Sequence, residues 1–373
     1  MRKQRKFDSM FGTPAVLCMA YLVLGLGLSA AEDSARIITF DAPGAGTGAG
    51  QGTYANGINA GGATVGWYVD GNNVNHGFLR TPEGTIVTFD APGAGTGAGQ
   101  GTLAYAMNSS EEVAGEYFDG NGVQHAFLRA SQGKITTFDA PGTGQGTFAC
   151  DVNDAGEISG DYNTGPLVGG KWQAFLRHKD GTIIEYSVGQ DITCWGYNGL
   201  SPTGWVTGVS VDQDTLHALG YLRAPDGSVT TFDAPGDGTG AYQGTYPDAI
   251  NLELTVAGNT TDANNVNHGF LRRVDGTFTT FDPPGAGTGA GQGTYALSVN
   301  LIGAIVGAFI DANDVYHGYS REPGAEGGFI TFDVPGAGTG AFQGTIAGGG
   351  NDAGAIAGYY VDDTGVAHGF LRK

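Results

Sequence analysis

A histidine and an aspartate recur at one spacing along this sequence. His76 and Asp90 are 14 residues apart, and the same spacing separates two further pairs. On adjacent antiparallel strands joined by a short hairpin, such residues face each other and can form a charge-assisted hydrogen bond. The predicted structural pairs are His76 with Asp90, His125 with Asp139, His268 with Asp282, and His368 with Asp41 if the two ends of the chain meet.

Departures from this rule help to interpret it. Where Gln173 replaces the histidine, Ser187 replaces the aspartate, as expected for partners. Asp233 is kept although Leu219 occupies its histidine position, and the turn before Asp333 is longer than the others. A pair that recurs favours a structural role over catalysis, because an active site usually needs one asymmetric constellation.

Several turns carry oxygen ligands at alternate positions. In Asp70-Gly-Asn-Asn73, carboxylates and amides suit a hard cation such as calcium. The same residue types are also the ordinary residues of hairpin turns, and no turn completes an EF-hand pattern. The sequence therefore requires no cofactor, and the candidate calcium ligands are Asp70, Asp262, Asp311 and Asp314.

Two cysteines and a group of aromatic residues lie where the sequence departs most from its own repeat. Cys150 and Cys194 are expected on neighbouring inner strands, as a disulfide in an exported protein or as two buried thiols. The aromatic residues either bind a carbohydrate or peptide by stacking, or fill space. These candidate ligand-binding residues are Trp172, Trp195, Tyr197 and Trp205.

A repeat of about 48 residues must position all these side chains. The aromatic residue of a Thr-Phe-Asp motif recurs seven times between Phe40 and Phe332, at spacings of 46 to 51 residues. A second marker, His-Gly-Phe-Leu-Arg or a variant, also occurs seven times. Units of this size are typical of propeller blades with four strands. We predict an all-β, seven-bladed β-propeller of antiparallel blades.

The first full unit shows how a blade is built. Strands are expected at 53–59, 63–70, 74–80 and 85–90, separated by Gly-, Asn- and Pro-containing turns. The Gly-rich stretch after Asp41 matches a dinucleotide-loop pattern by its letters, but a strand rather than a helix follows it. We interpret it as a crossover between blades.

The ends of the chain complete the predicted organisation. Residues 1–31 have a basic start, an apolar run and small residues at Ala30 and Ala31, as in a cleaved signal peptide. The remaining residues 32–373 form one propeller, in which 36–41 supply the missing fourth strand of the last blade. The predicted blades are 53–90, 102–139, 147–187, 191–233, 245–282, 294–333 and 345–373 with 36–41.

The formal net charge of −20 makes nucleic acid and anionic membranes poor partners. Removal of the basic leader makes the chain more acidic still, and no other apolar run is long enough to span a bilayer. We therefore expect a secreted or periplasmic monomer that is not membrane-bound after cleavage.

The units resemble a known family. The stretch Ile58 to Arg80, and the His125-Ala126-Phe127 motif, are similar to the HAF family of extracellular repeats across nearly the whole mature chain. The resemblance implies an exported repeat protein and no particular reaction. The long Gly-rich crossover departs from the family pattern.

Two functions follow as hypotheses. The first is an exported binding or scaffold module that recognises a carbohydrate or a protein ligand on one propeller face. The alternative is an enzyme acting on polysaccharides, a lyase or a glycoside hydrolase. A unique acid or base with a shifted pKa near the axis would favour the enzyme, and near-equivalent pockets in all blades would favour binding.

Overall fold

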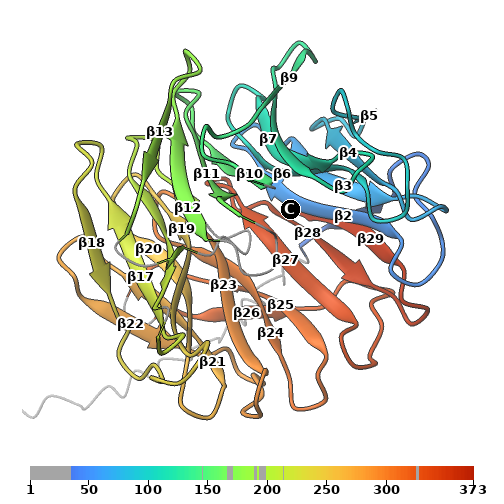
Figure 1. Ribbon diagram of the computed structural model, residues 1–373. Coiled ribbons are helices and arrows are strands. Elements are labelled where there is room, and N and C mark those ends of the chain that lie inside the picture. Colours follow the sequence, from blue (N-terminus) through green and yellow to red (C-terminus); the bar gives the residue numbers. More distant parts are fainter. Residues whose placement is uncertain are drawn as a thin grey trace, which may run out of the picture. The chain divides into compact units, whose positions relative to one another are not determined.

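The computed structural model describes residues 35–144, 146–165, 171–188, 191–192, 199–212, 214–324 and 327–373. Residues Arg36–Lys373 form one compact unit. Every regular element in the described part of the chain is a strand, and four-stranded antiparallel blades follow one another around a ring (Figure 1). The structure confirms the predicted seven-bladed propeller.

The first strands of neighbouring blades contact one another around the axis. They are β2 (Gly52–Ile58), β6 (Gly101–Met107), β10 (Gly146–Val152), β14 (Asp191–Ile192) with β15 (Gly199–Leu200), β19 (Gly244–Ile250), β23 (Gly293–Val299) and β27 (Gly344–Gly350). The second strands are β3 (Thr64–Val69), β7 (Val113–Phe118), β11 (Ile158–Asn163), β16 (Val206–Val211), β20 (Val256–Thr261), β24 (Ile305–Ile310) and β28 (Ile356–Val361).

The third strands carry the His-Gly-Phe-Leu-Arg marker. They are β4 (Asn75–Arg80), β8 (Gln124–Arg129), β12 (Trp172–Arg177), β17 (Ala218–Arg223), β21 (Asn267–Arg272), β25 (Tyr316–Arg321) and β29 (Ala367–Arg372). The outer, fourth strands are β5 (Ile86–Phe89), β9 (Ile135–Phe138), β13 (Ile183–Tyr186), β18 (Val229–Phe232), β22 (Phe278–Phe281), β26 (Phe329–Phe332) and, for the last blade, β1 (Ile37–Phe40).

The ring closes as the sequence predicts. Strand β1 pairs antiparallel with β29, so that Ile37 lies opposite Arg372 and Phe40 lies opposite Gly369. The N-terminal strand of the propeller is thereby tied to its C-terminal strand by a sheet ladder, which removes two open strand edges.

Each regular first strand contains a β-bulge that leaves one residue out of register with the second strand. We call these the axial bulge residues: Asn56, Tyr105, Cys150, Asp248, Leu297 and Gly348. They follow one another around the axis: Asn56 Nδ2 donates to the Tyr105 carbonyl at 3.0 Å, and the backbone of Asn56 lies against Gly348. The bulge residues of neighbouring blades therefore meet near the axis.

The Gly-rich crossovers are packed loops. Gln51 Oε1 accepts a hydrogen bond from Gly48 N at 2.9 Å, and Gln51 Nε2 donates to Asn73 Oδ1 at 3.0 Å. A side chain at Gly46 would overlap that Gln51 carboxamide. The crossover leads directly into β2, so it lacks the helix N-terminus that pyrophosphate binding requires. Crossovers and second-to-third strand turns share one face of the ring, which we call the crossover face.

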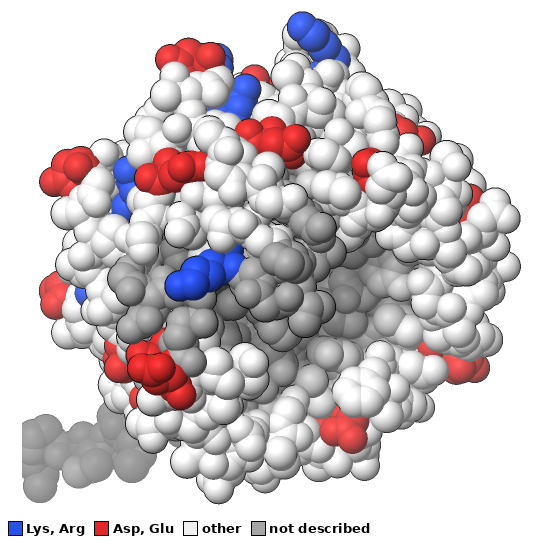
Figure 2. Space-filling view, viewed as in Figure 1, with Lys and Arg blue, Asp and Glu red and all other residues white. Residues whose placement is uncertain are grey.

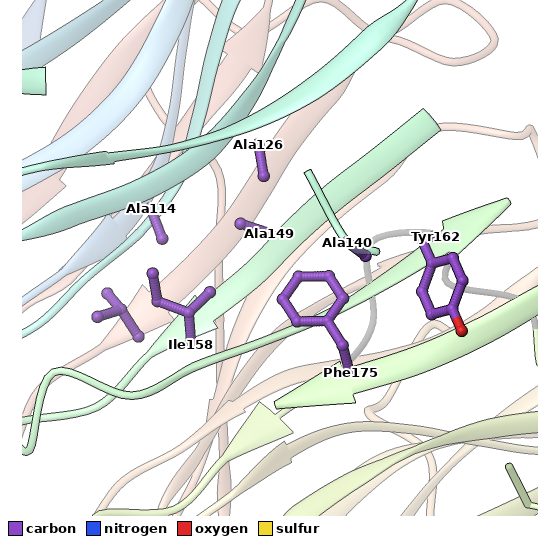
Figure 3. Close-up of a cluster of buried hydrophobic side chains, with 8 residues drawn as sticks. Ala114, Ala126, Ala140, Ala149, Ile158, Tyr162 and Phe175 are labelled. Carbon is purple, nitrogen blue, oxygen red and sulfur yellow. The ribbon is translucent and has the colours of Figure 1, made fainter. Parts of the chain in front are cut away.

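The core lies between blades. Phe40 on the outer strand of the last blade packs edge-on against Phe78 of the first blade at 6.0 Å, and Arg80 lies 4.9 Å above the Phe40 ring. The same trio occurs at every blade junction, so the two sequence markers are the two sides of one interface. Figure 3 shows the buried apolar cluster between the second and third blades, which includes Ala114 and Ala126 of the second blade and Tyr162 and Phe175 of the third.

Candidate functional site

The structure brings each predicted His/Asp pair together near the crossover face. Nδ1 of the histidine lies 2.9 Å from the carboxylate in the pairs of His76, His125 and His368, and 2.8 Å in the pair of His268 with Asp282. In the sixth blade, His317 and its aspartate also approach to 3.0 Å despite the longer turn. The histidine side chains are roughly one quarter exposed, so the pairs lie at the surface.

Asp282 has a further partner that the sequence prediction did not include. Its Oδ1 accepts a hydrogen bond from Thr294 Oγ1 at 2.6 Å, while Oδ2 binds the predicted histidine. In the first blade the matching threonine, Thr53, instead accepts a hydrogen bond from Ala42 N at 2.9 Å. Pro283 follows Asp282 and has no N–H to donate, so the hydroxyl of Thr294 turns to the carboxylate. Asp282 therefore pairs with the predicted histidine and also links it to the first strand of the next blade.

A second aspartate completes the arrangement around each histidine. His76 Nε2 lies 3.8 Å from Asp70, and the imidazole stacks on Tyr68 at 4.9 Å. The same sandwich surrounds His125, His317 and His368. Because the arrangement repeats around the ring, it locks the turns to the third strands and does not mark one reaction centre.

The candidate calcium ligands lie in the second-to-third strand turns. Asp70 Oδ1 accepts hydrogen bonds from the backbone of Asn72 and Val74, each at 2.8 Å. Asp262 and Asp311 make the same contacts in their blades. Asp314 instead accepts from Gln292 Nε2 at 2.8 Å. The carboxylates thus have turn-forming partners, and calcium stays a prediction.

Hydrogen bonds of this kind lower the carboxyl pKa of a turn aspartate, as in the matching turn of the second blade. At Asp119, backbone donation from Val123 and Asn121 lowers the pKa of the carboxyl below its ordinary value. The carboxylate therefore remains ionised and keeps its hydrogen-bond role over the whole neutral range.

The predicted aromatic site of the third and fourth blades is only partly described. Trp195, Tyr197 and Cys194 lie outside the described residues. Trp172 begins β12 and packs on Phe148 at 5.0 Å, whereas Trp205 precedes β16 and packs into the apolar cluster around Leu222 and Phe270. These strand ends lie on opposite faces of the ring, so Trp172 and Trp205 do not share a site.

Cys150 is buried on β10, one of the axial bulge residues, and is disulfide-bonded. Since Cys194 is outside the described residues, the pairing with Cys194 remains a prediction.

A cavity of about 550 Å³ lies near the axis between the sixth, seventh and first blades. Tyr54 and Trp67 stack at 5.4 Å with an interplanar angle of 7°, and Tyr359 meets Tyr54 edge-on at 5.0 Å. We call this cavity the axial pocket. Its lining includes Tyr54, Asn56, Trp67, Tyr295, Leu297, Ala308, Tyr316, Phe342, Ile346, Gly348, Tyr359 and Val361.

Small residues open the pocket at one place in the ring. Gly348 is the one axial bulge residue without a side chain. Ala308 lies opposite Tyr295 across the ladder, where the first blade has Trp67 opposite Tyr54. The missing side chains leave room that aromatic residues of neighbouring strands surround, so the pocket breaks the symmetry of the repeat.

Phe342 stands at the crossover-face side of the pocket. It is 66% exposed and has a positive φ of 61°, at a crossover position where Gly50, Gly99 and Gly291 occur in other blades. A left-handed conformation is costly for a phenylalanine. Tyr242 shares this position and conformation outside the pocket, so it is the place of the Phe342 ring in the pocket lining that makes it a candidate ligand contact.

The pocket is lined by uncharged side chains with phenolic edges. Burial raises the pKa of Tyr54, and burial together with nearby Tyr316 raises the pKa of Tyr295 to about 12. These phenols are protonated at neutral pH and can donate or accept hydrogen bonds. In the view of Figure 2, acidic groups lie around the periphery, and uncharged residues border the right-hand side of the central hollow.

A buried acid lies next to the aromatic lining. Glu116 is 3% exposed and accepts a hydrogen bond from the Tyr105 hydroxyl at 2.6 Å, and the Tyr105 ring is 5.6 Å from Trp67. Burial raises the pKa of Glu116 to about 7. Burial and the neighbouring Glu116 raise the pKa of Tyr105 well above its ordinary value.

Two more carboxyl groups are buried near the axis. Burial raises the pKa of Asp151 to about 6, although its carboxylate accepts hydrogen bonds from Leu200 N and Val152 N, each at 2.8 Å. The carboxylate oxygens of Asp248 have no hydrogen-bond partner among the described residues, and burial raises the pKa of this group well above its usual range.

Sequence reasoning missed Trp67, Phe342, Glu116 and Asp248. The signal was present, because each differs from the residues at the same position of the other blades. The position of the bulge, which decides which side chain faces the axis, was not visible in the sequence.

The chain is similar in fold to solved propellers. Selenomethionine-substituted virginiamycin B lyase from Staphylococcus aureus matches with a TM-score of 0.58 at 13% identity, over 91% of this chain and 99% of that chain. A catalytically inactive variant of the same lyase with quinupristin gives 0.57 at 14% identity over the same shares. At such identities the likeness shows the fold alone.

Acylaminoacyl peptidase from Pyrococcus horikoshii matches with a TM-score of 0.51 at 9% identity, over 86% of this chain and 51% of the peptidase. The propeller therefore spans about half of that enzyme. No family model and no curated protein matches the sequence. No helix in the described part of the chain has the length and apolar character needed to cross a bilayer.

Proposed function

We propose that this protein is an exported binding module, related to the HAF repeats, that holds a neutral sugar of a carbohydrate ligand in the axial pocket. One observation carries the proposal: a pocket of about 550 Å³ lies where the repeat is broken, and stacked aromatic rings with uncharged hydroxyl and amide groups line it. Pockets of this size and lining suit amphipathic ligands.

The chemistry of the lining favours a sugar. A pyranose offers apolar C–H faces that pack on aromatic rings and hydroxyls that bond to phenols and amides. Tyr54, Tyr316 and Asn56 supply such polar groups in the lining that they share with Trp67. An acidic polysaccharide is disfavoured, because the body of the protein is itself strongly acidic.

The leader-like residues 1–31 and the acidic composition support secretion or a periplasmic location. The protein acts as a monomer there, without nucleic acid or membrane partners. A protein ligand in the same pocket is the other outcome that the binding experiment below distinguishes.

The test is a calorimetric titration of the mature protein with neutral and acidic oligosaccharides, beside a panel of unrelated peptides. We expect a neutral oligosaccharide to bind, and Phe342→Gly and Trp67→Ala to weaken it at least about tenfold. Phe342→Gly introduces a residue that three other crossovers carry, so it preserves the fold. Tyr242→Gly is the matched control, because Tyr242 has the same crossover position and is not part of the pocket lining.

Binding of a peptide, and not of a sugar, with the same loss in Phe342→Gly would replace the ligand class and keep the site. Equal binding in Phe342→Gly, Trp67→Ala and wild type would overturn the pocket as the site.

Glu116 favours the second candidate, an enzyme acting on polysaccharides, because a carboxyl with a pKa near 7 suits general acid–base catalysis. Against it, Glu116 is 3% exposed and its hydrogen-bonded Tyr105 stays protonated, so this phenol supplies no base. The two functions separate by product analysis: new reducing ends or unsaturated uronates that Glu116→Gln abolishes would make the protein an enzyme. We expect no product.

A further inference from the structure

We infer that His217, Asp233 and Asp237 form a binding site for one divalent transition-metal ion, best suited to Zn²⁺, at the crossover after the fourth blade. Donor atoms of the three side chains lie within 4.8 Å of one another. Among the described residues this is the one group of three His, Cys, Asp or Glu side chains so arranged. The site lies apart from the axial pocket and does not depend on the proposed function.

The fourth blade builds the group by altering its His/Asp pair. Leu219 takes the position that a histidine has in every other blade except the third, and His217 is displaced to the residue before β17. Asp233 follows β18, as its counterparts follow the other outer strands. Asp237 comes four residues later, in the Gly-rich crossover.

The distance between the first two residues differs from an ordinary pair. His217 Nε2 lies 3.4 Å from Asp233 Oδ1, and the remaining pairs use Nδ1 at 2.8 to 3.0 Å. Two ligands on a tetrahedral zinc ion with bonds of about 2.0–2.1 Å lie about 3.4 Å apart. The imidazole and the carboxylate are thus already at the separation that a shared metal requires.

The third ligand is unique to this crossover. The other long crossovers carry an alanine where Asp237 stands: Ala45, Ala94, Ala286 and Ala337. A repeat that keeps alanine elsewhere has here gained a carboxylate beside a displaced histidine. The two changes coincide in one blade, which a metal site explains and a turn does not.

The surroundings fit an ion. Thr245 Oγ1 donates to Asp237 Oδ2 at 3.1 Å and orients this carboxylate, as groups around metal ligands commonly do. Donor atoms of the Asp233 and Asp237 carboxylates lie within 4.8 Å of each other, so a cation held between them would relieve their repulsion. The Asp233 side chain is 48% exposed, so the ion can enter from solvent and keep a water ligand.

An imidazole ligand distinguishes this site from the candidate calcium turns. Calcium and magnesium prefer oxygen ligands, whereas imidazole suits zinc and neighbouring transition metals. Three protein ligands with an open position are also the ligand number of zinc sites that bind a further molecule.

The experiment uses the tag-free mature protein, stripped with chelator and titrated with Zn²⁺ by calorimetry and with Co²⁺ by visible absorption. We expect one Zn²⁺ per chain, Co²⁺ bands of a low-symmetry site that Zn²⁺ removes, and much weaker binding of Ca²⁺. Asp237→Ala should weaken Zn²⁺ binding at least about tenfold. Because alanine is the residue of the other crossovers, this variant keeps the fold, which its melting curve verifies.

His268→Leu is the matched control. It breaks the pair with Asp282, whose crossover carries Ala286 in place of Asp237, and it introduces the leucine that the fourth blade carries naturally. It should bind Zn²⁺ like wild type. Absence of stoichiometric Zn²⁺ binding, or equal binding in Asp237→Ala, would overturn the inference. Preference for Ca²⁺ over Zn²⁺ would overturn the assignment of a transition metal.

Discussion

The Tyr105 hydroxyl donates a 2.6 Å hydrogen bond to Glu116 Oε1, between an axial bulge residue and the second strand of the same blade. The carboxyl is otherwise enclosed, with Gln124 Nε2 at 3.5 Å as its other polar neighbour. These two hydrogen bonds, of which the one from Gln124 is long, do not replace full hydration of a carboxylate, so burial favours the protonated form. The second blade therefore carries an acid that titrates near neutral pH.

Glu116→Gln should remove part of the pH dependence of folding. The pKa of Glu116 is about 7 in the folded protein against an ordinary 4.5, so the folded state holds this proton more tightly. Its stabilising contribution is complete below pH 4.5 and is lost as the pH rises through 7, by about 3 kcal/mol. We expect Glu116→Gln to unfold at higher denaturant concentration than wild type at pH 8, and to lose this advantage at pH 4.5.

Glu112→Gln is the control for this measurement, because Glu112 lies outside the buried region and accepts one hydrogen bond from Asn108. A wild-type and a Glu116→Gln protein with parallel stability curves from pH 4.5 to 8 would contradict a buried, titrating Glu116.

Asp248→Leu should stabilise the propeller at pH 8. Both carboxylate oxygens of Asp248 are buried without a hydrogen-bond partner among the described residues, and burial raises the pKa of this group strongly. Leu297 is the axial bulge residue of the next blade, so the position accepts leucine. We expect a gain of about 1–3 kcal/mol from removing an unpaired buried polar group, measured by urea unfolding. A loss of stability would show that Asp248 has an essential partner.

The fold was predictable because its signals repeat. The aromatic position of Phe40 recurs seven times, and so does the marker that contains His76. Together these two markers define the length of a blade and the closure of the ring. The ends of the strands in the first full unit differ from the prediction by one or two residues. The sites were harder to predict because they depend on departures from the repeat. Gly348 creates space only because the bulge turns its position toward the axis. Asp237 is a candidate metal ligand only because the fold places it near His217, which lies 20 residues away in the sequence.

The His125/Asp139 pair should contribute modestly and as a unit. The two groups approach to 2.9 Å, with Asp139 42% exposed, so solvent competes for the interaction. His125→Gln and Asp139→Ser reproduce Gln173 and Ser187 of the third blade. In a double-mutant cycle by urea unfolding we expect a coupling of about 1 kcal/mol. Additive effects of the two substitutions would mean that the recurring pair is not an energetic partnership.

Phe342→Gly should raise stability while it removes the ligand contact. At φ 61° a glycine relieves the strain of a left-handed phenylalanine, and the 66% exposed ring loses little packing. We expect a gain of about 0.5–1 kcal/mol, reduced by the greater freedom of glycine in the unfolded chain. Tyr242→Gly, with φ 58°, should behave alike in stability. Destabilisation of both variants would indicate that these rings hold the crossovers in place.

Phe40→Ala should cost as much as Phe89→Ala if the closure strand is as firmly held as a covalently continuous one. Phe40 packs on Phe78 and under Arg80, and Phe89 makes the same contacts with Phe127 and Arg129. Removing either half-buried ring leaves a cavity between blades, for which we expect a loss of about 2–4 kcal/mol in urea unfolding.

The control for this comparison is Thr39→Ala, an exposed residue on the same strand, which should change stability by less than about 0.5 kcal/mol. A much smaller loss for Phe40→Ala than for Phe89→Ala would mean that β1 detaches before the ring unfolds. Equal losses would show that one strand pairing, Ile37 to Phe40 on β29, makes the last blade an equivalent member of the ring.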